Sequence, residues 1–140
     1  MALGARDMDL KTELRIFLEE ESAQAPVWGR SDCSATPVRW ARRLGHDVRL
    51  PTYGSRDEAH AIVARHGSLV AAWDHFLAGT AIVERLGEPE LGDVAVVDTR
   101  LYGQVGGILA NARILAIRRD EGGFAWFGPV RQFEKVWEIS

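Results

Sequence analysis

The stretch VAVVDTRLYGQVGGIL, residues 94–109, marks the point where this sequence changes from helical to β-rich patterns. It contains two short runs rich in branched apolar residues, separated by charged residues and glycine. Runs of this kind bounded by turn residues are typical of β-strands. Counting three later runs, the predicted strands are Val94–Val97, Val105–Leu109, Ile114–Ile117, Phe124–Phe127 and Lys135–Ile139. We therefore expect an antiparallel five-stranded sheet or small barrel over about residues 92–139.

Upstream of this stretch, over about residues 8–79, the apolar residues recur at helical spacing. Leu10, Leu14, Phe17 and Leu18 share one face, which predicts an amphipathic helix from about Asp9 to Glu20, capped by Asp7 or Asp9. Cap and stop residues predict three further helices at Ser34–Leu44, Ser55–Arg65 and Ser68–Leu77. Helices followed by strands indicate an α+β domain, with the helices packed on the sheet.

The composition fits a single globular domain over residues 1–140. Of its 140 residues, 46% are hydrophobic and 26% charged, and the net charge is −3. Because the arginines are scattered and outweighed by acids, we expect no nucleic-acid partner. No apolar stretch approaches the ~18 residues of a spanning helix, so we expect no membrane insertion. The single cysteine excludes an internal disulfide, and we expect folding in a cytoplasm.

Cys33, the only cysteine, follows Asp32 where a loop enters the second predicted helix. Backbone N–H groups at a helix start stabilise a thiolate, so Cys33 is a candidate for covalent catalysis if a base lies nearby. Pro37 fits the helix best if Ser34 is its cap, although Asp32 is the alternative cap. For Cys33 itself, the alternative is a buried cysteine that acts as a small apolar residue.

A cysteine hydrolase also needs a histidine that accepts and returns a proton. The four histidines, His46, His60, His66 and His75, all lie in the helical half, and we expect solvated or capping roles for them. Their spacing with one cysteine does not match a zinc site, so no metal or other cofactor is expected. Asp93 lies in a Gly-Asp turn before a strand, which favours a structural role.

The tryptophans divide into two groups. Trp73 and Trp137 fit core faces, whereas Trp28 and Trp126 lie in glycine-rich segments. The latter two are candidates to line a groove or an interface, although core packing remains the alternative.

Three segments occur together in an informative order: Trp28-Gly29-Arg30-Ser31-Asp32-Cys33, Leu91-Gly92-Asp93-Val94-Ala95-Val96 and Gln104-Val105-Gly106-Gly107-Ile108-Leu109. Over about residues 27–139 the sequence resembles the NlpC-type peptidases and amidases, papain-like enzymes that cleave peptidoglycan stem peptides or related amides. Their pattern is Asp-Cys at a helix start, Gly-Asp before a strand, then His-Val-Gly on the next strand. The sequence is most similar to a short subgroup found in tail modules of bacteriophages and gene-transfer agents, which shares segments like Gly45-His46-Asp47 and a tyrosine turn like Tyr53.

The resemblance implies a papain-like NlpC-type fold and assigns positions to individual residues. Cys33 matches the nucleophile, and Gln104 falls where the family has its histidine. Trp28 and Asp32 become candidate substrate-binding residues. Glutamine cannot exchange a proton near neutral pH, so Gln104 does not replace a general base.

Three functions follow as hypotheses. The first is a phage-type tail component, at the tip or hub, with a degenerate catalytic site, which acts in tail assembly or cell-wall engagement. Its expected partners are other tail-tip or hub proteins, with peptidoglycan as a further candidate, and its location is the virion or a virion-like tail. The second is an active peptidoglycan-cleaving cysteine hydrolase used during genome delivery, with Cys33 and an unrecognised base. The third is a stand-alone bacterial domain that binds a cell-wall peptide without cutting it.

Overall fold

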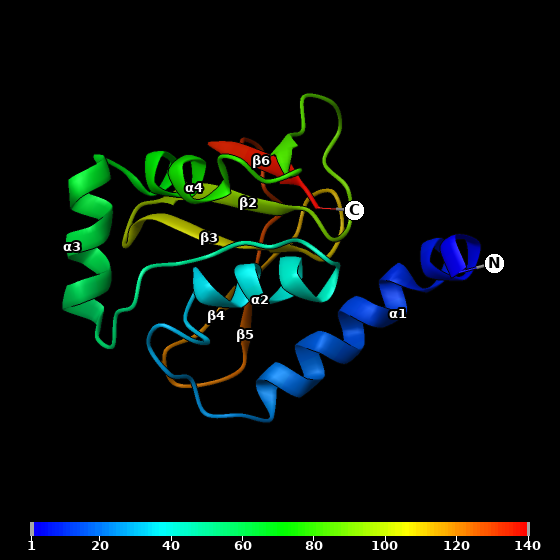
Figure 1. Ribbon diagram of the computed structural model, residues 1–140, viewed down its shortest axis with the longest axis horizontal. Helices are drawn as coiled ribbons and strands as arrows, with labels where there is room; N and C mark the ends of the chain where they lie inside the picture. Colours follow the sequence, from blue (N-terminus) through cyan, green and yellow to red (C-terminus); the bar gives the residue numbers. More distant parts are fainter. Residues whose placement is uncertain (1, 140) are drawn as a thin grey trace.

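The computed structural model describes residues 2–139, with the side chains of residues 10–139. Within this range four helices precede six strands, so the predicted α+β class is confirmed (Figure 1). The helices are α1 (Ala2–Ser22), α2 (Ala35–Arg43), α3 (Arg56–His66) and α4 (Leu69–Leu77). The strands are β1 (Val83–Glu84), β2 (Val94–Thr99), β3 (Gly103–Leu109), β4 (Leu115–Arg118), β5 (Phe124–Phe127) and β6 (Lys135–Glu138).

The strands form one open sheet in the order β1-β6-β2-β3-β4-β5, and every neighbouring pair is antiparallel. The predicted strands β2 and β3 pair in register from Val94 with Ile108 to Thr99 with Gly103. Strand β2 lies between β6 and β3, and its first four residues are buried on both faces. The sheet is therefore built around the stretch that first indicated it.

The prediction of five strands was wrong by one, in the part of the chain that the structure describes. The additional strand, β1, has two residues that pair with Glu138 and Trp137 of β6. Strand β1 has only 2 residues, both of them exposed. So short a strand shows no repeating alternation of apolar and polar residues in the sequence. Strand β1 depends on the partner strand rather than on a pattern of its own.

Each face of the sheet carries a hydrophobic cluster. Helices α2 and α4 pack on one face, where the main core includes Trp40, Trp73 and Trp137. The predicted core positions of Trp73 and Trp137 are therefore confirmed, with exposed fractions of 7% and 2%. On the other face, Val130 completes a second cluster with strand residues, including Val97 and Leu109.

The helix starts follow the predicted caps except at α1. The Ser55 hydroxyl accepts the N–H of Glu58 at 3.1 Å, and the Glu58 carboxylate accepts the N–H of Gly54 at 2.7 Å. These two bonds stabilise the first turn of α3 from both sides. Helix α1, however, begins at Ala2, so Asp7 and Asp9 lie inside it and the prediction that one of them caps it was wrong.

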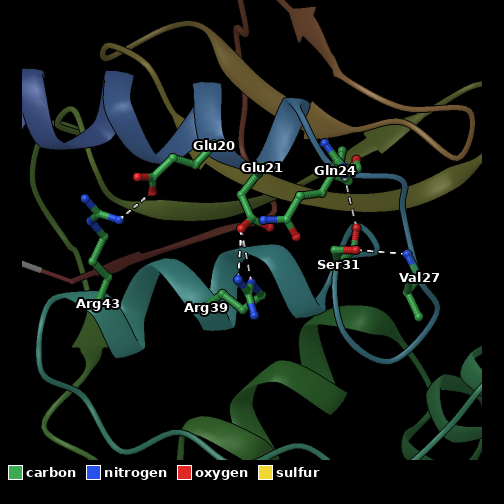
Figure 2. A network of polar contacts seen from close by, with 8 residues as sticks. Glu20, Glu21, Gln24, Val27, Ser31, Arg39 and Arg43 are labelled. Carbon is green, nitrogen blue, oxygen red and sulfur yellow. Dashed lines mark hydrogen bonds and ion pairs between the residues drawn. The ribbon is translucent and has the colours of Figure 1, made fainter.

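The C-terminal end of α1 is fastened to α2 by two ion pairs (Figure 2). Glu21, only 3% exposed, pairs with Arg39 at 3.0 Å, and Glu20 pairs with Arg43 at 3.0 Å. Within the described residues, no helix combines the length and apolar character that crossing a bilayer requires.

Candidate functional site

The Asp32 carboxylate organises the loop that carries Cys33. It accepts the backbone N–H groups of Gly29 at 2.7 Å, Ser34 at 2.9 Å and Ala35 at 3.0 Å. The Tyr53 hydroxyl donates a further bond to it at 3.0 Å. These four bonds occupy both carboxylate oxygens, so the geometry gives Asp32, a predicted substrate-binding residue, a role in holding the loop.

Two residues share the capping of α2. Ser34 occupies the cap position but its side chain makes no capping bond, which Asp32 supplies instead. Pro37 is the third residue of the helix. Thr36 and Val38 donate to the carbonyls of Asp32 and Ser34, so Pro37, which has no N–H, leaves out the bond to the Cys33 carbonyl between them. Cys33 lies two residues before the first helical residue, at the helix entrance, as expected.

Gly29 fixes how this loop meets the segment around Tyr53. Its φ is +86°, and an added Cβ would lie 2.0 Å from the Tyr53 carbonyl oxygen. Because only glycine fits there, the backbone of the Trp-Gly pair packs directly against Tyr53. Asp32 bonds to both Gly29 and Tyr53, so these residues form one packed unit. Gly29 and Asp32, two residues of the motif around Cys33, therefore have structural roles in the loop.

The surroundings of Cys33 favour the neutral thiol. Burial, followed by the negative charges of Asp32 and Asp120, raises the pKa of Cys33 from 9.0 to about 12. Its own backbone N–H and the Arg56 guanidinium lower the pKa by less. At pH 7 the thiolate fraction is then about 10⁻⁵, far below the few per cent of an ordinary cysteine. The helix-entrance effect expected from the sequence is outweighed by desolvation and by Asp32.

Arg56, the cation near Cys33, is already paired. It forms an ion pair with Asp120, in the turn between β4 and β5, and its guanidinium lies 5.8 Å from the centre of the Trp28 ring. A cation neutralised by an acid next to the sulfur stabilises a thiolate much less than a free cation would. Trp28 itself is half-buried.

The histidines have other surroundings. His46 bonds through its Nε2 to the Ile139 carbonyl and lies beyond the end of α2 opposite to Cys33. Helix α2 has 9 residues and is therefore about 13 Å long. The rings of His66 and His75 lie 4.7 Å apart, between the last turns of α3 and α4. His60 is exposed on α3. Among the described residues, no histidine makes a hydrogen bond to Cys33 or affects its pKa.

Gln104, which the resemblance places at the position of the NlpC-type histidine, bonds to helix α4. Its Oε1 accepts the N–H of Val70, in the first turn of α4, at 3.2 Å. Further along β3, Gly106 admits the ring of Trp73, because an added Cβ would lie 2.3 Å from that ring. The Trp73 Nε1 donates to the Ser34 hydroxyl at 3.2 Å. The indole therefore fills the space between β3 and the start of α2.

The sequence model of one family matches residues 5–139 of the chain, almost its whole length. The chain belongs to the DUF6950 family. This family is described only as a domain of unknown function. No curated protein matches the chain.

In this DUF6950 chain, the predicted site residues are only partly brought together. Asp32 and Arg56 both lie near Cys33, and the Arg56 guanidinium also lies over the Trp28 ring. Gln104 instead accepts the Val70 N–H of α4. Within residues 10–139, no group of three or more histidine, cysteine, aspartate or glutamate side chains is arranged to hold a metal ion. Trp126 lies 61% exposed on the edge strand β5, away from the core.

Two site residues of this DUF6950 chain were missed by sequence reasoning. Arg56 and Asp120 are 64 positions apart and lie in a helix start and a turn, so no local pattern joins them. Asp93, by contrast, has the predicted structural role. It is fully buried, accepts the N–H of Glu90 at 2.9 Å and pairs with Arg85.

Proposed function

We propose that this protein is a structural component of a phage-type tail, at the tip or hub, with an NlpC-like fold and a catalytic site that no longer functions. The observation that carries the non-catalytic part is the chemistry around Cys33. The thiol has a pKa of about 12, lies beside two acids, and has no histidine bonded to it among the described residues. The tail location rests on the sequence resemblance.

The expected rate losses support this proposal. A missing general acid–base typically slows a reaction by 10²–10⁴-fold. The thiolate fraction of about 10⁻⁵ at pH 7 adds a further loss, because only the thiolate attacks. Neither loss is offset by Gln104, whose side chain oxygen accepts the Val70 N–H.

The arrangement of elements supports the papain-like part of the proposal. A cysteine lies at the entrance of a helix, that helix packs on an antiparallel sheet, and the strand carrying Gln104 contacts the same helix. The fold that the resemblance implies requires this placement. A structural protein derived from an enzyme would keep this arrangement of elements although its thiol no longer reacts.

The test compares wild type with Cys33→Ser in two assays. In the first, purified protein is incubated with dye-labelled peptidoglycan, and we expect no dye release above buffer from either form. In the second, the same substitution is made in the genome of a phage or transfer agent that carries the chain. We expect intact particles with unchanged infectivity, whereas deletion of the chain should stop tail assembly.

Either of two results would overturn the proposal. The first is dye release by wild type that Cys33→Ser abolishes, which would identify an active hydrolase. The second is normal assembly after deletion of the chain, which would remove the structural role. Cys33→Ala serves as the control for the serine hydroxyl, because alanine adds no polar group at the half-buried position.

A further inference from the structure

An open groove of about 250 Å³ lies between α2, the loop 28–30 and the segment 50–53, which belongs to neither a helix nor a strand. In the described part of the chain, three arginines and no acidic residue line it: Arg30, Arg39 and Arg42. Trp28, Leu50 and Pro51 add apolar surface beside these cations. The groove is therefore basic in a chain whose overall charge is −3.

Most of this positive charge is available to a ligand. Arg39 is committed, because its Nε and Nη2 both contact the Glu21 carboxylate (Figure 2). Arg42 uses only its Nε, which donates to the Val48 carbonyl at 2.8 Å. Arg30 is exposed and makes no ion pair or hydrogen bond through its side chain within the described residues. Arg30 and Arg42 thus provide guanidinium donors that suit carboxylates.

The other wall of the groove offers backbone groups. The segment between α2 and α3, which contains Leu50 and Thr52, follows a stretched course (Figure 1). The N–H and C=O groups of these two residues have no partner among the described residues. In extended chain, residues two apart present these groups on the same side. Unpaired, extended backbone is the usual template for the addition of a peptide strand.

We propose that this groove binds an extended acidic segment of a partner polypeptide. Carboxylates of the segment pair with Arg30 and Arg42, and its backbone pairs with residues 50–52. The volume is below the ~300–1,000 Å³ typical of small-molecule pockets, so a few side chains of a peptide fit better than a cofactor. The assignment goes beyond the tail role and depends neither on it nor on the state of Cys33.

The experiment measures fluorescence anisotropy of a labelled oligoglutamate peptide on the full chain. An oligoglutamine peptide of equal length is the neutral control. We expect saturable binding of the acidic peptide only, weakening as salt is raised because the contacts are ionic. Arg30→Gln should weaken binding roughly 3–10-fold, the effect of losing one partly exposed charged contact. Since Arg30 has no side-chain partner within the described residues, this variant should fold normally.

Arg100→Gln is the matched control, because Arg100 is also exposed but lies outside the groove. Equal weakening by both substitutions would overturn the proposal, since it would show a general charge effect. Equal binding of the glutamine peptide would also overturn it. Competition by inorganic phosphate at the concentration of the peptide itself would assign the groove to small free anions instead of a polypeptide.

Discussion

The surroundings of Cys33 and the arginine groove are built on the same short loop but differ in charge and accessibility. Around Cys33, Asp32 and Asp120 face one cation, and the thiol is held neutral. The groove is lined by three arginines and by no acidic residue, and the space is open. Only Arg39 is paired, with Glu21, which lies outside the lining. Trp28 belongs to both regions, because its ring contacts Arg56 and also lines the groove. The same loop therefore presents a neutral, half-buried thiol in one region and an open basic surface in the other.

The largest effect is expected from breaking the loop that both regions share. Gly29→Ala places a Cβ against the Tyr53 carbonyl and strains a φ of +86°. We expect a loss of about 3–5 kcal/mol in the free energy of unfolding, measured with denaturant. Loss of peptide binding in the groove should accompany it.

Gly45→Ala is the control for backbone strain alone. Gly45 has a similar φ of +98°, but an added Cβ would meet nothing within 4 Å. Its cost should be about 1–2 kcal/mol. Equal costs at Gly29 and Gly45 would mean that the contact with Tyr53 does not matter, and the shared loop would then not be the common support of the two regions.

Much of this fold could be predicted from local patterns. The strands β2 to β6 and the helices α3 and α4 follow from short apolar runs and from Ser55 and Ser68, which act within three residues of their own helices. Strand β1 could not be predicted, because its two residues pair only through β6. The start of α1 was placed too late, since an aspartate can lie inside a helix as well as cap it.

The candidate site was less predictable, because its properties arise from distant contacts. The sequence identifies Cys33 as a cysteine at a helix entrance. Whether its thiol is protonated depends on burial and on distant residues such as Asp120. The groove did have one local signal: Arg39 and Arg42 are three residues apart on one helix, which places them on one face. The opposite wall of the groove, formed by segment 50–53, follows only from the fold.

A second prediction sharpens the contrast in protonation. Because the pKa of Cys33 is raised from 9.0 to about 12, the folded state keeps a proton that the unfolded state releases. The resulting stability is complete below pH of about 9 and is lost as pH rises toward about 12. Denaturant unfolding at pH of about 8 and about 10.5 should show a fall, of which Cys33 contributes at most about 2 kcal/mol.

Cys33→Ser removes this contribution, because serine does not titrate in that range. Its unfolding free energy should therefore fall less between the two pH values than that of wild type. The remaining fall includes Tyr53, whose pKa is also raised, first by burial and then by Asp32. Parallel curves for the two proteins would contradict a neutral, buried thiol and would revive Cys33 as a nucleophile.

The smallest effect is expected at Gln104. Gln104→His introduces the residue that the NlpC-type pattern has at this position, but it replaces the acceptor of the Val70 N–H, so stability should fall by about 1 kcal/mol. We expect no release of dye from labelled peptidoglycan, because Trp73 still fills the space between β3 and Ser34 and the thiol stays neutral. Gln104→Ala, which loses the same acceptor without adding an imidazole, is the matched control for stability. Turnover by Gln104→His that Gln104→Ala lacks would mean that one added imidazole is sufficient for hydrolysis. The other groups around Cys33 would then still be able to support catalysis.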